Sequence, residues 1–261
     1  MREPLRDFTD DAFLDGRVRV RQPKQGYRAA MDPVLLAAAV PSVNDRGARA
    51  GGPVLDLGCG AGVALLCYGA RVAHAELWGM ERDPETAHLA RANLDRNAMA
   101  GRGRILTGDL LAPPDDLPQG VFAEVMANPP YHRAEASAAS PHPQRAASNR
   151  EGEALLADWI EAGLRALAPK GGLTLIHRAD RISEICALLR GRAGAITIFP
   201  LWPRAGRAAK RVIVRARKGV KSPDLLAAGL MLHAGDPEKE EGQRYTREAE
   251  AVLRDGAALS L

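Results

Sequence analysis

Apolar residues follow two alternating patterns along most of the chain. Short continuous runs are typical of buried strands, and longer stretches with apolar residues three and four positions apart are typical of helices. We expect strands at 54–57, 77–80, 104–107, 121–126, 173–177, 195–199 and 211–214. We expect helices at 34–40, 63–72, 151–167 and 181–189, and one that opens at Asp83 and Pro84. Strands separated by helices of this length predict an α/β fold with a doubly wound, mostly parallel sheet and helices on both faces.

The residues before Pro53 follow a different pattern. Val18 and Val20 alternate with arginines, which indicates a basic, partly extended lead-in. Asp32 is expected to cap the short apolar helix, with Pro33 at its first position. We therefore expect a lead-in and capping helix over residues 1–52, packed on a core domain over residues 53–261.

The least regular stretch is 132–150, which is rich in Ala, Ser and Pro. A loop of that length inside a compact domain is usually functional or mobile, so this one is a candidate gate of the site.

Charge changes the picture because it is concentrated in two places. The chain has 261 residues, 46% of them hydrophobic and 26% charged, and a net charge of +4. Basic residues without an intervening acid occupy segments 17–28 and 204–221. One such segment is more simply a solvated face, but two of them flanking one core make a polyanion partner such as RNA an equal alternative. If Arg211, Arg215 and Lys218 contact phosphates, their removal flattens the salt dependence of binding by roughly 0.7 to 0.9 log units per contact.

Cysteine and histidine spacing predicts neither a disulfide nor a metal. Cys59, Cys67 and Cys186 form no C-x-x-C pair, and the six histidines show no metal-binding spacing. The N-terminus lacks the apolar core of a signal peptide, and no apolar run has membrane-spanning length. We expect a cytoplasmic protein.

The first core strand runs into a glycine-rich turn that begins a helix. Gly58, Gly60 and Gly62 let the backbone approach a ligand that side chains would block. A dinucleotide fold would need a glycine where Val63 stands, so that motif fails. Asp56, two positions before the first glycine, makes the turn resemble motif I of class I methyltransferases, whose cofactor is S-adenosylmethionine.

Two further acids follow the next two strands. Glu81 ends the second strand, where the ribose hydroxyls of a nucleoside need an acceptor. Asp109 follows the third strand and is placed to accept from the adenine amino group of the cofactor. Either one alone is more simply a turn carboxylate, but in register with the glycine turn both become expected ligands.

The fourth core strand ends in the tetrapeptide Asn128-Pro129-Pro130-Tyr131. A planar amino group is a weak nucleophile because its lone pair is delocalised. The Asn128 side-chain oxygen and the Pro129 carbonyl can accept its two hydrogens, on a main chain stiffened by adjacent prolines. Tyr131 can stack on a flat acceptor or offer its π face to a sulfonium cation. The alternative is a strand-terminating turn, which Asn-Pro-Pro also makes well.

This tetrapeptide resembles motif IV of the amino methyltransferases. The wider sequence resembles the bacterial tRNA(Val) adenine-N6 methyltransferase family in Gly26-Tyr27-Arg28, in Asp32-Pro33-Val34-Leu35-Leu36, in 128–133 and in Pro200-Leu201-Trp202-Pro203-Arg204. The resemblance covers about Phe8 to His233. It implies a class I, Rossmann-like fold and methylation of an adenine beside the anticodon, and it places Tyr27, Arg28 and Asp32 over the cofactor pocket.

Three alternatives remain open from sequence. A glutamine amide poses the same nucleophile problem, so release-factor glutamine methylation is one, although the expected separate helical domain does not precede the motif. DNA adenine methylation is another, since a base must be extruded in either case. The third is a non-catalytic RNA-binding protein on the same fold, against which the intact Asp56, Glu81, Asn128 and Tyr131 argue.

Overall fold

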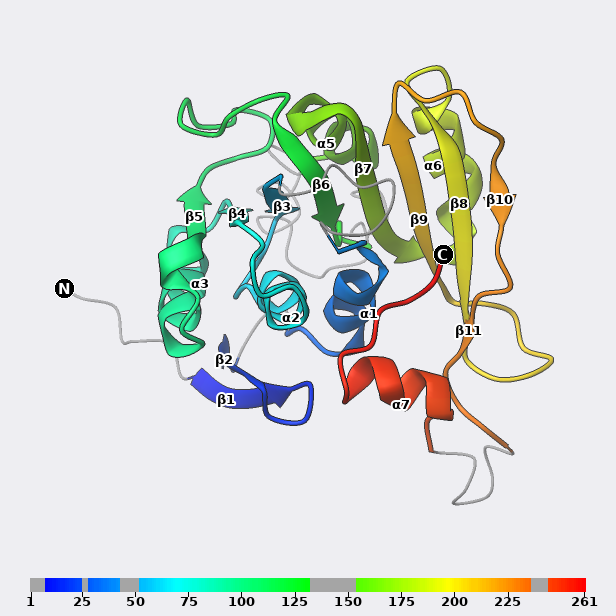
Figure 1. Ribbon diagram of the computed structural model, residues 1–261, viewed down its shortest axis with the longest axis horizontal. Helices are drawn as coiled ribbons and strands as arrows, with labels where there is room; N and C mark the ends of the chain where they lie inside the picture. The colour runs from blue at the N-terminus through cyan, green and yellow to red at the C-terminus, as the bar shows by residue number, and fades with distance from the viewer. Residues whose placement is uncertain (1–7, 25–27, 43–51, 132–153, 236–243) are drawn as a thin grey trace, which may run out of the picture.

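The molecule is built around one twisted sheet (Figure 1), and the computed structural model describes residues 8–24, 28–42, 52–131, 154–235 and 244–261. The strand order is β10-β8-β9-β7-β6-β3-β4-β5, and β11 pairs with β8. The strands are β3 (Val54–Leu57), β4 (Leu77–Glu81), β5 (Gly103–Thr107), β6 (Phe122–Ala127), β7 (Leu167–Arg178), β8 (Ala193–Trp202), β9 (Arg211–Lys218), β10 (Leu225–Leu226) and β11 (Leu230–Met231). Neighbours from β7 to β5 are parallel, whereas β9 is antiparallel to both β7 and β8. The expected mostly parallel α/β sheet is confirmed.

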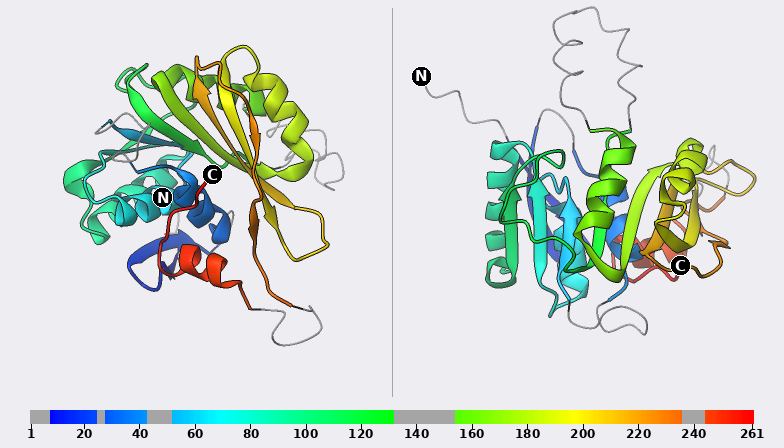
Figure 2. Two further views of the ribbon diagram at one scale, coloured as in Figure 1. Left: turned by 45° about the vertical axis from the view of Figure 1, so that its right-hand side comes forward. Right: turned by 90° about the horizontal axis from the view of Figure 1, so that it is seen from above.

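Helices cover both faces of this sheet (Figure 2). One buried cluster joins one face to α1 (Met31–Ala39), α2 (Val63–Arg71) and α3 (Pro84–Arg96). A second cluster joins the other face to α5 (Leu156–Ala166) and α6 (Ile182–Leu189). Short 3-10 turns lie at Ala100–Arg102 and Ala179–Arg181. No helix in the described part of the chain is long and apolar enough to cross a membrane.

The chain changes direction along the sheet between β3 and β6. From β3 it proceeds outward to β4 and β5, and it then returns to place β6 on the other side of β3. In open α/β sheets this switch point opens a crevice at the carboxyl ends of the strands, which is where ligands bind. The glycine turn after β3 and the tetrapeptide after β6 therefore meet at this crevice.

The lead-in proves to be a hairpin. β2 (Val18–Pro23) pairs antiparallel with β1 (Phe8–Phe13). β1 was not predicted from the sequence because the centre of this strand is polar. The expected cap is also wrong: α1 begins at Met31 with Ala30 as N-cap and no side-chain cap. Asp32 does not cap the helix because its carboxylate is bonded elsewhere. Asp83, by contrast, caps α3 as expected, its side chain accepting from the Thr86 amide at 3.0 Å.

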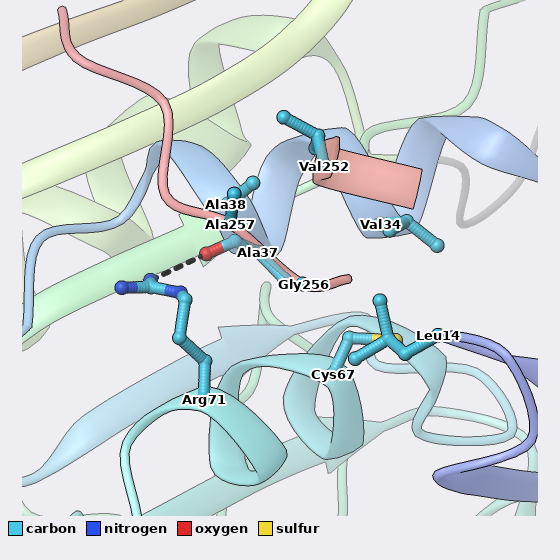
Figure 3. A pocket seen from close by; sticks show the side chains of 9 residues that line it. All are labelled: Leu14, Val34, Ala37, Ala38, Cys67, Arg71, Val252, Gly256 and Ala257. Carbon is cyan, nitrogen blue, oxygen red and sulfur yellow. Dashed lines mark hydrogen bonds between the residues drawn. The ribbon is translucent and has the colours of Figure 1, made fainter. Parts of the chain in front are cut away.

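The C-terminal segment packs beside α1 and α2 (Figure 3). The sequence missed α7 (Arg247–Leu253), β10 and β11, since all three are short. Leu259 donates its amide to the Ala38 carbonyl of α1 at 2.8 Å. Arg71 of α2 donates to the carbonyls of Ala37, at 2.8 Å, and Val40. These contacts supply hydrogen-bond donors to carbonyls at the C-terminal end of α1, which have no donor within the helix.

One strand is longer than its apolar run indicated. α5 ends at Ala166 and β7 starts at once, with a register shift against β6 and a positive φ of 66° at Lys170. Residues 168–172, between the expected helix and the expected strand, therefore lie within β7 and not in a helix-to-strand loop. The expected loop 132–150 falls outside the described residues.

Candidate active site

The glycine turn after β3 needs its glycines for more than one reason. Gly58, Gly60 and Gly62 have φ values of 64°, 54° and 88°, in the left-handed region that other residues avoid. A Cβ on Gly58 would lie 2.4 Å from the Trp159 ring of α5, whereas one on Gly60 would meet nothing within 4 Å. Gly58 therefore permits packing inside the protein, and Gly60 leaves open space on the turn. The contribution of Trp159 was not predicted, and no local sequence signal points to it.

Glu81 fixes this turn to the next strand. One of its carboxylate oxygens accepts from the Gly60 amide at 2.9 Å and the other from the Asp83 amide at 2.9 Å. Each carboxylate oxygen has two acceptor positions, so Glu81 can hold the turn and still accept from a ligand hydroxyl.

Asp56 is a buried carboxyl with unusual electrostatics. Its side chain lies on β3 with 3% exposure, and one oxygen, Oδ2, has no hydrogen-bond partner among the described residues. Burial, together with the charge of Glu81, raises the pKa of Asp56 to about 8, and a hydrogen bond from the Leu65 backbone opposes the shift. An acid in this state is largely protonated at neutral pH, and a cation placed beside it would favour its ionised form.

Asp109 shapes the connection after β5. Its Oδ1 accepts from the Leu111 amide at 2.9 Å, and its side chain is half-buried. Asp109, Glu81 and Asp56 thus belong to the consecutive parallel strands β5, β4 and β3, at or beyond their ends. The structure brings the three expected acids to one side of the glycine turn.

The tetrapeptide lies directly after β6, next to β3. The Asn128 side-chain oxygen is buried, Pro129 is buried, and Pro130 is exposed. Tyr131 donates its hydroxyl to Asp32 Oδ2 at 2.6 Å, a contact between residues far apart in sequence. The candidate nucleophile-binding oxygens therefore lie on a strand end that is anchored to α1.

The expected cofactor residues of the N-terminal segment have other contacts. Tyr27 lies outside the described residues. Arg28 forms an ion pair with Asp11 of β1 at 2.9 Å. Asp32 is bonded to Tyr131 and also to Arg211 of β9, at 3.0 Å.

The late cationic strand is largely occupied within the protein. Arg215 pairs with Glu124 of β6 at 2.6 and 2.9 Å, with side chains only 14% and 2% exposed, and also donates to Thr174. Lys218 donates to the Leu167 carbonyl at 2.7 Å. Arg215 is thus committed to the fold, which contradicts its expected phosphate contact, whereas the expected phosphate contact of Lys218 stays a prediction. A basic run cannot reveal this, because their partners lie about fifty and ninety residues away.

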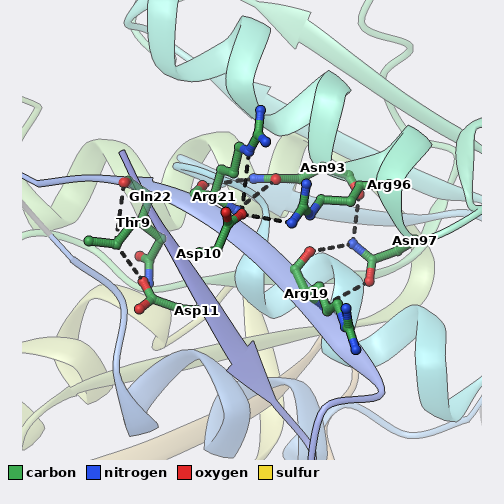
Figure 4. A network of polar contacts seen from close by, with 9 residues as sticks. All are labelled: Thr9, Asp10, Asp11, Arg19, Arg21, Gln22, Asn93, Arg96 and Asn97. Atoms are coloured by element: carbon green, nitrogen blue, oxygen red, sulfur yellow. Dashed lines mark hydrogen bonds and ion pairs between the residues drawn. The ribbon is translucent and has the colours of Figure 1, made fainter. Parts of the chain in front are cut away.

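The N-terminal basic segment is likewise tied to the core (Figure 4). Asn93 of α3 and Asn97, the C-cap residue of that helix, bond the backbone of β2 at Arg21 and Arg19 through both their oxygen and their nitrogen atoms, at 2.8 to 3.0 Å. Asn93 also donates to the Ala61 carbonyl of the glycine turn at 2.9 Å. The two asparagine side chains therefore make the hydrogen bonds to the β2 backbone that a neighbouring strand would make. Asn93 also links the hairpin to the glycine turn.

Groups for metal or thiol chemistry do not assemble in the described part of the chain. Its His, Cys, Asp and Glu side chains form no cluster of three or more that could hold an ion. Cys59 lies in the glycine turn, and burial raises the pKa of its thiol well above the usual range. Cys59 is therefore a packed, protonated thiol.

Comparison with known proteins agrees with this geometry. The model of the methyltransferase small domain family matches residues 35–184, which contain the glycine turn, the three acids and the tetrapeptide. The chain belongs to that family. It is a methyltransferase, and S-adenosylmethionine is its methyl donor.

Individual relatives extend the similarity. The chain is 30% identical over 177 residues to a tRNA1(Val) (adenine(37)-N6)-methyltransferase of Porphyromonas gingivalis, covering 67% of this chain and 68% of the relative. It is 27% identical to an enzyme of the same name from Actinobacillus succinogenes, over 94% and 96% of the two chains. A solved structure titled a predicted O-methyltransferase from Agrobacterium tumefaciens superposes with a TM-score of 0.69 and 29% identity, over 88% and 99%. The resemblance inferred from the motifs is confirmed.

Proposed function

We propose that this chain transfers the methyl group of S-adenosylmethionine to the N6 amino nitrogen of an adenine in the anticodon loop of a tRNA. The observation that carries the proposal is the tetrapeptide at the switch point, one strand away from the glycine turn. The names of the two bacterial relatives support the substrate. A tRNA substrate implies that the enzyme works in the cytoplasm.

The cofactor would lie along the carboxyl edge of β3, β4 and β5. The open space at Gly60 fits a ligand on the backbone of the turn, and Glu81 retains acceptor positions for ribose hydroxyls. Asp109 would accept from the adenine amino group. The unpartnered Oδ2 of Asp56 fits the positive end of the methionine portion, because a buried carboxylate is stabilised by a nearby cation. When bound, S-adenosylmethionine supplies an electrophilic methyl group on a sulfonium centre.

The tetrapeptide would prepare the acceptor nitrogen. The Asn128 side-chain oxygen and the Pro129 carbonyl each accept one hydrogen of the amino group, which draws the hydrogens out of the base plane and makes the lone pair available. The nitrogen would then be oriented for in-line attack on the methyl carbon, whose bond to sulfur breaks as its bond to nitrogen forms. The extra proton of the nitrogen would leave afterwards, so no general base has to start the reaction. The contribution of the protein is positioning and charge stabilisation.

RNA contacts would lie in the connection between β8 and β9 and not at Arg215 of β9. Arg207 and Lys210 are exposed in this connection, and Lys210 immediately precedes Arg211, which contacts the tetrapeptide. Cations at this place can meet phosphates flanking an extruded base.

The test offers methyl-labelled S-adenosylmethionine with total tRNA, ribosomal RNA, DNA or release factors in separate reactions. We expect label in tRNA, recovered as N6-methyladenosine after digestion. Label only in release-factor glutamine, or only in DNA, would refute the substrate assignment.

Replacing Asn128 with Ala tests the role of the tetrapeptide. Loss of one preorganised polar contact costs about two to three orders of magnitude in turnover. Cofactor affinity should stay within about twofold, because the proposed contact is to the acceptor and not to the donor. Wild-type turnover in this variant would refute the assignment of Asn128.

A further inference from the structure

The ring of Tyr131 is held by side chains from three separate elements. Its hydroxyl donates to Asp32 Oδ2 of α1 at 2.6 Å, and Asp32 Oδ2 also accepts from Arg211 Nε of β9 at 3.0 Å. The Arg211 guanidinium lies over the Tyr131 ring, 4.4 Å from the ring centre. His177 of β7 packs against the ring edge-to-face, with 5.2 Å between centroids and 74° between planes. We call Asp32, Arg211 and His177 the tyrosine clamp.

The charges of the clamp balance one another. Asp32 and Arg211 form a half-buried ion pair, with side chains 19% and 34% exposed. The pKa of the Arg211 guanidinium is raised by Asp32 and Tyr131 against the effect of burial, which opposes it. His177 is 1% exposed, and burial lowers its pKa to about 4, so it is neutral under ordinary conditions. An arginine neutralised in this way adds little long-range attraction for phosphate.

The clamp also restricts what the ring can do. A guanidinium covers one face of Tyr131, so at most one face is left for a flat acceptor. The hydroxyl bond fixes the far end of the ring, and an aromatic ring anchored at both ends loses little further freedom when a base stacks on it. Asp32 lies near the start of α1 and Arg211 is the first residue of β9, so rigid elements hold both anchors.

We propose that Asp32 and Arg211 are positioning residues that fix the ring of Tyr131 for stacking on the acceptor base. They act through Tyr131 and touch neither the cofactor nor the RNA backbone. This inference rests on the proposed function for the identity of the base, but the clamp itself can be tested without substrate.

The substrate-free test uses fluorine NMR of protein labelled with 3-fluorotyrosine. The chain has four tyrosines, and the Tyr131 signal is the one that Tyr131→Phe removes. Asp32→Asn should shift or broaden that signal and leave the other three in place. Asp180→Asn is the matched control, because Asp180 forms an exposed ion pair with Arg178, the cross-strand neighbour of Arg211. An unchanged Tyr131 signal in Asp32→Asn would overturn the clamp even if tRNA proves to be the wrong substrate.

The kinetic test separates positioning from ligand binding. Asp32→Asn and Arg211→Lys should each lower the single-turnover rate by about tenfold, while the dissociation constant of S-adenosylmethionine changes by less than about twofold. In a Tyr131→Phe background, Asp32→Asn should add less than about a further twofold, since the hydroxyl through which it acts is gone. Fully multiplicative effects, or a large loss of cofactor affinity at an unchanged rate, would overturn the proposal.

The salt test addresses the competing role of Arg211. Arg211→Gln should leave the slope of log affinity for tRNA against log salt unchanged, because its charge is already paired. A slope reduced by roughly 0.7 to 0.9 would make Arg211 a phosphate contact and would overturn the proposal.

Discussion

The buried carboxyl of Asp56 makes a quantitative prediction about stability and pH. Its pKa is raised from 3.8 to about 8, mainly by burial, so the folded protein holds a proton that the unfolded chain releases. The contribution of Asp56 to the free energy of unfolding is fully present below about pH 4, is lost as pH rises, and no longer changes above about pH 8. The loss is about 1.4 kcal/mol per pH unit between those limits, or at most about 6 kcal/mol in total.

Asp56→Asn isolates this effect because asparagine does not titrate. The amide places a buried donor where Oδ2 lacks a partner, which costs about 1 to 3 kcal/mol at every pH. As pH rises from 5 to 8, the free energy of unfolding of the wild type should therefore fall relative to that of the variant by about 1.4 kcal/mol per pH unit.

Urea unfolding at intervals of half a pH unit, followed by circular dichroism, measures this difference. Asp95→Asn removes an exposed carboxyl on α3 and serves as the control for loss of one acidic group. A difference between Asp56→Asn and wild type that stays flat from pH 5 to 8 would refute the raised pKa. It would also remove the reason for expecting a cation beside Asp56.

Three further substitutions test how the site is supported. Glu124→Ala should cost about 3 to 5 kcal/mol in chemical denaturation, because it leaves Arg215 buried without its partner, and a loss below 1 kcal/mol would contradict this. Gly58→Ala should lower the free energy of unfolding in chemical denaturation far more than Gly60→Ala does, since its Cβ would lie 2.4 Å from an indole ring; equal losses would show that backbone strain alone matters. Asn93→Ala removes three hydrogen bonds and should raise amide exchange in β2 by tenfold or more, and unchanged exchange would mean that the hairpin is held by its apolar side chains.

Features set by short segments could be predicted from the sequence. The strand before the glycine turn has the expected bounds, 54–57, and Asp83 caps α3 as expected. Both follow from local rules, namely a continuous apolar run before glycines and an acid before a proline. The carboxyl edge of the sheet could be predicted as well, because alternating strands and helices leave few topologies.

Features set by distant partners could not be predicted. Asp32 had the residue type and position of a helix cap, but its partners Tyr131 and Arg211 lie 99 and 179 residues away. Arg215 lies in a basic run that is typical of a phosphate contact, but its side chain forms an ion pair with Glu124. A sequence shows where a charge lies along the chain, but only the fold shows whether an opposite charge already neutralises it.

The atom that receives the methyl group is the most direct test of the account. The tetrapeptide is suited to a planar amino nitrogen, whereas the similar Agrobacterium structure is titled a predicted O-methyltransferase. Trideuteromethyl S-adenosylmethionine, unmodified tRNA and mass spectrometry of the digested nucleosides decide between nitrogen and oxygen. We predict the heavy methyl group on N6 of adenosine. Its recovery on a ribose hydroxyl would contradict the role assigned to Asn128 and Pro129.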